Sequence, residues 1–182
     1  MRIVAGRFGG RRLTAPRGQA TRPTSDRVRE SLFSLLGPLD GLLVLDLFAG
    51  SGALGIEALS RGARRAVFVD EAPDAIKVVH ANLEAVDLTE TAGEAVVRRQ
   101  DARAFLRSAR TAGQEYDLVF LDPPYRLAVA LGHELSPLLA GLLAPGARVV
   151  TESDRRTPLE LDLPLKDERR YGDSLIRIHE PE

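Results

Sequence analysis

Apolar runs of strand length alternate with helix-like segments over most of this 182-residue chain. The strand-like runs cover residues 42–48, 65–70, 95–101, 116–122 and 146–153. The helix-like segments between them cover residues 53–62, 73–86, 102–110 and 127–143. Apolar strands that are each followed by a helix are typical of a parallel sheet covered by helices on both sides. The alternation therefore predicts a doubly wound α/β fold.

Shorter elements flank this alternating region. The first residues have β-like pieces around Gly9 and Gly10, which predicts a hairpin. A helix should follow Pro23; its candidate caps and apolar positions are Thr24, Ser25, Asp26, Val28, Leu32, Leu35 and Leu36. The tail predicts two strands around a turn at 171–173, and so short a connection makes that pair antiparallel. We expect a mostly parallel sheet with an antiparallel last strand.

A glycine-rich segment, DLFAGSGALG, joins the first strand to its helix. Gly50, Gly52 and Gly55 have the Gly-x-Gly-x-x-Gly spacing, and Asp70 ends the second strand 20 residues after Gly50. By itself the pattern suits a dinucleotide site, or a tight turn that packs a helix closely. Open α/β sheets bind their ligands at this carboxyl edge.

Asp46 favours a different ligand. It ends the first strand just before the glycines, where a carboxylate would repel a pyrophosphate but suits a cation such as the ammonium of a methionine moiety. Asp70 can accept hydrogen bonds from two ribose hydroxyls. S-adenosylmethionine (SAM) has both features, and it is the cofactor that we expect. A buried Asp46 with a capping role is the alternative. Asp101, which ends the third strand, could contact the adenine or cap the next helix, and the residues leave both open.

The fourth strand ends in Asp122-Pro123-Pro124-Tyr125. The exocyclic amine of a nucleobase is a poor nucleophile, so it must be held with its N–H bonds aimed at acceptors. Asp122 and the Pro123 carbonyl can supply two acceptors, and the prolines stiffen the corner and remove N–H donors. Tyr125 can stack on the base. The motif predicts methyl transfer to such an amine by orientation and electrostatics; a capped Pro-Pro turn is the alternative.

Charge is distributed unevenly, although the net charge is −1. Residues 1–30 carry eight Arg against two acids, so this segment is +6 and the remainder is −7. A basic end on an acidic body is expected of a protein that meets a polyanion such as nucleic acid, although a solvated Arg-rich terminus would look the same. There is no cysteine and only three dispersed His, so we expect no metal site. No apolar stretch has membrane-spanning length, and we expect a cytoplasmic protein that does not bind membranes.

The motifs together resemble a known family. DLFAGSGALG followed by DPPY resembles the amino-directed class I SAM-dependent methyltransferases, which have a Rossmann-like sheet. Within that class, MRIVAGRFGGRRL, RPTSDRVRESLF, DLFAGSGALGIEALSRGA and the late YGD resemble the bacterial RsmD family over nearly the whole chain. That family has a second Thr where this chain has Ser25, which keeps the hydroxyl.

The resemblance implies methylation of the N2 amine of one guanine in 16S ribosomal RNA, free or in an assembling small subunit. It implies a basic N-terminal extension (1–22) and a methyltransferase domain (23–182), and a monomer is expected. The residues implied in SAM binding are Asp46, Gly50, Gly52, Asp70 and Asp101. Those implied in holding the guanine are Asp122, Pro123 and Tyr125. Those expected near the RNA are Arg7, Arg11, Arg12, Arg22, Thr24 and Arg27.

Three other functions compete with this interpretation. An adenine-N6 methyltransferase acting on DNA or RNA shares DPPY, but 182 residues leave little mass for sequence readout. An NAD-dependent oxidoreductase shares the glycine loop, but Asp46 and the lack of an obvious proton-transfer residue disfavour it. A non-catalytic RNA-binding module would have no need of the complete set of strand-end carboxylates.

Overall fold

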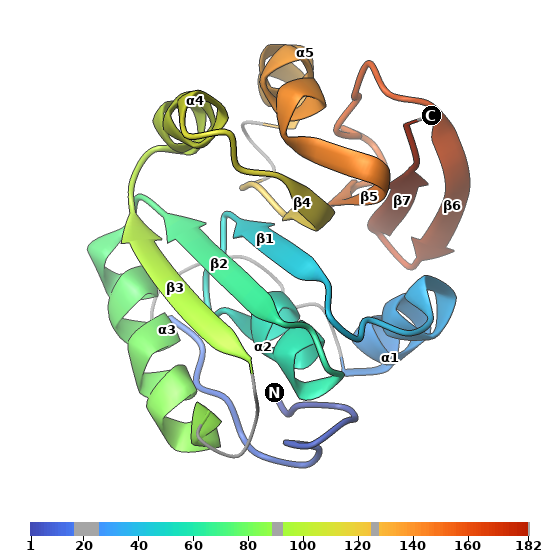
Figure 1. Ribbon diagram of the computed structural model, residues 1–182. Coiled ribbons are helices and arrows are strands. Elements are labelled where there is room, and N and C mark those ends of the chain that lie inside the picture. The colour runs from blue at the N-terminus through green and yellow to red at the C-terminus, as the bar shows by residue number, and fades with distance from the viewer. Residues whose placement is uncertain (17–25, 89–92, 125–127, 182) are drawn as a thin grey trace.

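The structure is a computed structural model that describes residues 1–16, 26–88, 93–124 and 128–181. Its centre is a seven-stranded sheet with the strand order β3-β2-β1-β4-β5-β7-β6 (Figure 1). Strands β1 to β5 are parallel, and β7 is antiparallel to both of its neighbours, β5 and β6. The predicted α/β fold, mostly parallel with an antiparallel last strand, is confirmed.

The elements agree with the predicted ranges within a few residues. The strands are β1 (Leu43–Leu47), β2 (Arg65–Asp70), β3 (Glu94–Arg99), β4 (Tyr116–Leu121), β5 (Leu143–Asp154), β6 (Leu165–Tyr171) and β7 (Ser174–His179). The helices are α1 (Asp26–Leu36), α2 (Ala53–Ser60), α3 (Pro73–Val86), α4 (Ala102–Thr111), α5 (Ala128–Leu139) and the 3-10 turn η3 (Ala140–Leu142). No helix within the described ranges combines the length and the apolar character that a membrane crossing needs.

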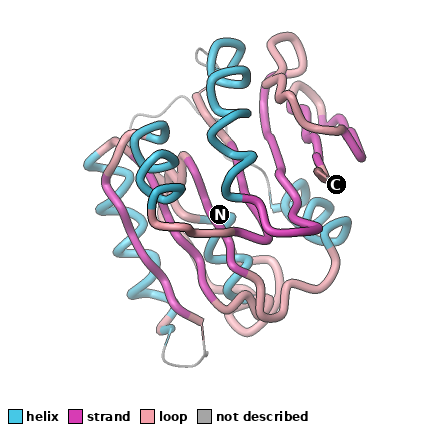
Figure 2. The backbone as a smooth tube through the Cα atoms, turned by 45° about the horizontal axis from the view of Figure 1, so that its top comes forward, coloured by secondary structure: helices cyan, strands magenta, loops and turns pink. Residues whose placement is uncertain are grey.

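Two apolar cores lie between the sheet and its helices, which cover both faces (Figures 1 and 2). Helices α1, α2 and α3 cover one face, where Phe33 of α1 packs against Phe120 of β4. Helices α4 and α5 cover the other, where Phe105 is buried. Because successive strand residues point to opposite faces, Val44 belongs to the first core and Leu45 to the second.

Strand register places several polar side chains on the face covered by α1. Asp46 of β1 lies opposite Phe120 of β4, and Phe120 lies opposite Val150 of β5. Two residues further along their strands, Asp122 and Glu152 point to the same face by the alternation of side chains. The carboxyl ends of three adjacent strands therefore bring three carboxylates together.

The N-terminal segment forms the predicted turn without two regular strands. It has one antiparallel bridge, between Arg2 and Arg12, and the Ile3 and Leu13 amides donate to the carbonyls of Arg11 and Met1 across it. The backbone amides of Val4 and Ala5 donate instead to the carboxylate of Glu57 on α2, at 2.7 and 3.0 Å. Since each amide has one proton to donate, these residues cannot also pair in a hairpin ladder.

The same segment is part of the first core. Ile3, Phe8 and Leu13 are buried among the side chains of the α1–α2–α3 layer. The division into an extension (1–22) and a methyltransferase domain (23–182) stays a prediction, because residues 17–25 lie outside the described residues. The described part of the segment is nevertheless packed against the domain.

Helix α1 buries a different stripe from the predicted one. Its buried positions are Arg29, Leu32, Phe33 and Leu36. The prediction that Leu35 belongs to the apolar face is wrong, because its side chain is 41% exposed. The buried face instead includes Arg29 and Phe33, which the predicted stripe did not contain.

Candidate active site

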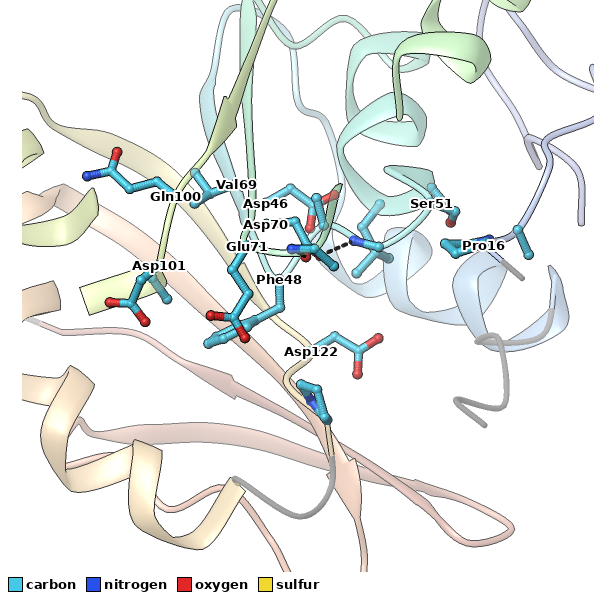
Figure 3. A pocket seen from close by; sticks show the side chains of 18 of the residues that line it. Pro16, Asp46, Phe48, Ser51, Val69, Asp70, Glu71, Gln100, Asp101 and Asp122 are labelled. Atoms are coloured by element: carbon cyan, nitrogen blue, oxygen red, sulfur yellow. Dashed lines mark hydrogen bonds between the residues drawn. The ribbon is translucent and has the colours of Figure 1, made fainter. Parts of the chain in front are cut away.

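A cavity of about 390 Å³ opens at the carboxyl ends of β1, β2, β3 and β4. Its volume is within the range of small-molecule sites, roughly 300–1,000 Å³. Figure 3 shows Asp46, Asp70, Asp101 and Asp122 around it, each at the end of a different strand. Gly50 of the glycine loop also lines the cavity. The fold thus brings four predicted site carboxylates to one place.

The glycine loop turns sharply at the cavity wall. Gly50 and Gly52 have φ angles of +56° and +75°, and Phe48 also has a positive φ, of +74°. Glycine adopts a positive φ without steric cost, so it suits positions 50 and 52 of the turn, whereas Phe48 adopts this conformation as a non-glycine residue. The carbonyl of Val69 accepts hydrogen bonds from the amides of Phe48 and Ala49, at 3.0 and 2.9 Å, and ties the loop to β2.

The other two glycines mainly serve packing. A Cβ atom at Gly55 would lie 2.3 Å from Cε1 of the Phe68 ring, and one at Gly52 would lie 3.3 Å from the same atom. Both residues are buried behind the loop, and neither is among the described residues that line the cavity. The close-packing role of the motif therefore applies to them, while Gly50 faces the cavity.

Asp70 holds the loop in place. Its Oδ2 accepts a hydrogen bond from the Gly50 amide and its Oδ1 accepts one from the Ala72 amide, each at 2.9 Å (Figure 3). Each carboxylate oxygen has two lone pairs, so both oxygens retain capacity for ligand hydroxyl groups. Glu71 and Phe48 lie beside it in the cavity wall.

Asp46 is a buried carboxyl group, only 2% exposed. It accepts a hydrogen bond from the Gly55 amide at 3.0 Å. Burial raises the pKa of Asp46 to about 7, and the charge of Asp70 adds to this effect. A buried carboxyl group that lines a cavity favours a cationic ligand, because a positive charge there stabilises its ionised form.

Asp101 caps helix α4. Its Oδ1 accepts a hydrogen bond from the Ala104 amide at 3.0 Å, so the helix-cap alternative is confirmed. The carboxylate is half-buried, and it also lies 3.7 Å from the guanidinium of Arg103. Because Asp101 lines the cavity as well, a contact with the adenine stays a prediction.

The Asp122-Pro123-Pro124 corner forms the opposite wall. Asp122 is half-buried and Pro124 is exposed, and both line the cavity, while Pro123 is buried. Burial raises the pKa of Asp122 well above its ordinary value, and the charges of Glu152 and Asp46 raise it further. The corner is open toward the glycine loop.

Two buried residues beside this corner were missed from the sequence. Arg29 is 1% exposed and lines the cavity, and Glu152 is 5% exposed at the end of β5. Arg29 could have been found from its spacing, because it precedes Leu32, Phe33 and Leu36 by three, four and seven residues. These intervals mark one face of a helix. Glu152 had no comparable signal, because a strand-end acid is more often solvated.

The predicted RNA-contact residues fall into three groups. Arg7, Arg12 and Arg27 are exposed. Arg11 is half-buried; its guanidinium lies 5.2 Å from the Phe8 ring centroid and donates to the carbonyl of Val86. Arg22 and Thr24 lie outside the described residues, as does Tyr125 of the residues predicted to hold the guanine.

Comparison with known proteins agrees with this arrangement. The model of the RsmD family, described as "Conserved hypothetical protein 95", matches residues 1–180. The chain belongs to this family. A member from Bacillus subtilis (strain 168), "Putative rRNA methyltransferase YlbH", is 40% identical over 98% of each chain. "Ribosomal RNA small subunit methyltransferase D" of Escherichia coli (strain K12) is 40% identical over 85% of this chain and 75% of its own.

Solved structures that are similar to this chain share the fold. The structure titled "Putative methyltransferase yhhF from Escherichia coli" has a TM-score of 0.81 and 36% identity, covering 100% of this chain and 98% of its own. The hypothetical protein TTHA0928 of Thermus thermophilus has a TM-score of 0.81 and 30% identity, covering 99% of each chain. The Rossmann-like methyltransferase fold is therefore shown for this chain.

Proposed function

We propose that this protein transfers a methyl group from SAM to the exocyclic N2 amine of a guanine in 16S rRNA. One observation carries the proposal. The Asp122-Pro123-Pro124 corner and the glycine loop are walls of the same cavity, so an amine held at the first can meet a methyl donor held at the second. Family membership supplies the guanine and the ribosomal RNA.

The residues present fit the cofactor. Asp46 would offer a buried carboxylate to the ammonium group, whose positive charge would offset the burial that raises the pKa of Asp46. Asp70 would offer its two oxygens to the ribose hydroxyls, and Asp101, which lines the same cavity, would contact the adenine. When bound there, SAM supplies an electrophilic methyl group on a sulfonium.

The corner's task is to orient the amine. Asp122 and the Pro123 carbonyl would each accept a hydrogen bond from one N–H group of the amine. This arrangement would aim the nitrogen lone pair toward the glycine loop. With SAM held at the glycine loop, the carboxylate form of Asp122 would stabilise the positive charge that develops on the amine nitrogen as it takes the methyl group. The nitrogen then releases one proton, for which Asp122 is the nearest base in the proposed arrangement.

The RNA contact is assigned to the arginines of the N-terminal segment. Exposed Arg7 and Arg12 lie on the segment whose Met1, Ala15 and Pro16 line the cavity, so phosphates bound there would lead a strand toward the active site. The target guanine must be splayed out to enter, which favours a loop of rRNA or of an assembling small subunit. We expect the protein to act as a monomer in the cytoplasm.

The test is transfer of tritiated methyl from SAM to 16S rRNA, to small subunits and to DNA. We expect label in guanine N2 of ribosomal RNA and none in DNA. Asp122→Ala should reduce transfer at least about 100-fold, the usual effect of removing one transition-state partner. SAM affinity of the variant, measured by calorimetry, should stay within a few-fold of wild type. Equal loss of affinity and transfer would contradict the role of Asp122.

A further inference from the structure

Arg29 is an arginine buried at the wall of the cavity. Its side chain is 1% exposed, and it lines the same cavity as Asp46 and Asp122. Burying a guanidinium is costly unless its charge and its N–H groups find partners. The partners of Arg29 therefore indicate what it does.

Contacts of α1 fix where Arg29 lies over the sheet. At one end of the helix, the Leu36 carbonyl accepts a hydrogen bond from Arg148 in the middle of β5, two residues before the Val150 that lies opposite Phe120. One turn earlier, the ring of Phe33 lies 5.7 Å from that of Phe120 on β4. The helix therefore runs antiparallel to these strands, and Arg29, a further turn back, reaches the level of their carboxyl ends.

The guanidinium is only partly satisfied. One terminal nitrogen donates to Asp26 Oδ1 at 2.6 Å and to the carbonyl of Arg2. The other lies 3.7 Å from the Met1 sulfur, a weak acceptor. The Nε–H has no partner in the described part of the chain. A buried donor without a partner is unfavourable, so an oxygen acceptor on a ligand would be bound strongly here.

The acidic surroundings place this donor on the substrate side. The negative charges that act on Arg29 are those of Asp26, Glu57 and Glu152. The charge of Glu152 also raises the pKa of Asp122, in the corner that is proposed to hold the base. The cavity wall thus contains a cationic donor, Arg29, together with the Asp46 and Asp122 carboxylates.

The Watson–Crick edge of guanine has the complementary order: the O6 acceptor, then N1–H and N2–H2 donors. Arginine is the side chain that most often recognises guanine O6. We infer that Arg29 donates to O6 of the target guanine while Asp122 holds its N2 amine, so that Arg29 selects guanine over adenine. Adenine in the same pose has an amine in place of O6 and no amine at C2, so it would leave the buried Arg29 donor unpaired and offer Asp122 nothing to hold. The inference rests on the proposed function and names the residue behind its base specificity.

The experiment changes O6 alone. The guanine that wild-type protein methylates is first mapped, and an rRNA fragment is then prepared with 6-thioguanine at that position, which keeps N1–H and N2. Sulfur is a weak acceptor, so we expect wild-type kcat/KM to fall about 10-fold on this RNA. With Arg29→Met, the guanine and thioguanine RNAs should become equal substrates within about 2-fold. Should Arg29→Met not fold, Arg29→Lys keeps the charge and should still narrow the difference.

Controls distinguish this role from a structural one. Arg148→Lys alters the other end of the α1–β5 contact and should leave the 10-fold discrimination intact. A wild-type protein that does not discriminate, or an Arg29 variant that loses activity equally on both RNAs, would overturn the inference. So would a parallel loss of S-adenosylhomocysteine affinity, which would assign Arg29 to the cofactor carboxylate. Absence of transfer to any rRNA by wild type would instead refute the proposed function.

Discussion

The Gly50 amide donates a hydrogen bond to the Asp70 carboxylate at 2.9 Å, which joins the glycine loop to the end of the neighbouring strand. Asp70 therefore shapes the loop as well as facing the cavity. We expect Asp70→Ala to weaken SAM binding at least about 10-fold, since hydrogen bonds to a charged group are among the stronger ones. Calorimetry measures this, with Asp74→Ala on exposed α3 surface as control. An unchanged dissociation constant would exclude Asp70 from the ribose.

Asp46 should make cofactor binding depend on pH. Its pKa is about 7 in the folded protein, against an ordinary value of 3.8. Because the ionised carboxylate pairs with the ammonium group, affinity for SAM should rise as pH increases through 7. Asp46→Asn should lose both the high-pH affinity and this dependence. A pH-independent affinity in wild type would contradict the assignment.

The same carboxyl group should affect stability with the opposite sign. Between about pH 4 and 7 the folded protein keeps a proton on Asp46 that the unfolded chain has lost, so the free energy of unfolding should fall as pH rises through this window. Urea unfolding across that range tests it. Asp46→Asn should show a smaller slope, with the raised pKa of Asp122 supplying the remainder.

Gly55→Ala should destabilise the fold without touching a ligand. The added Cβ would lie 2.3 Å from the Phe68 ring, which cannot move far inside the core. We expect the free energy of unfolding to fall by about 1–3 kcal/mol, as in other overpacked cores. Gly141→Ala is the control, because its Cβ would meet only the flexible side chain of Arg110. Similar losses for both variants would contradict the packing argument.

The arginines of the N-terminal segment should separate into two kinds. Arg12 is exposed, so Arg12→Ala should leave the melting temperature unchanged and reduce the salt slope of RNA binding by about 1. Arg11 packs on Phe8 and donates to Val86, so Arg11→Ala should lower stability by about 1 kcal/mol. Point changes test this better than removal of the whole segment, which would also take Phe8 out of the core. A salt slope that Arg12→Ala leaves unaltered would remove Arg12 from the phosphate contacts.

Much of the site was predictable because its signals are local. Asp46, Asp70, Asp101 and Asp122 each follow a strand that the sequence reveals, and parallel strands bring their carboxyl ends to one edge. The predicted hairpin around Gly9 and Gly10 closes through backbone hydrogen bonds, but its arms are not regular strands, because the Val4 and Ala5 amides bond to Glu57 of α2. A turn signal cannot report a competing partner more than 50 residues away.

The sequence by itself determined the order of strands and helices and the row of carboxylates at their ends, since periodicity and turn residues act over a few neighbours. Only the tertiary structure decided that Arg29 faces inward and that Glu57 anchors the N-terminal segment. Burial of a charge depends on groups brought together from distant parts of the chain. No short stretch of residues contains that information.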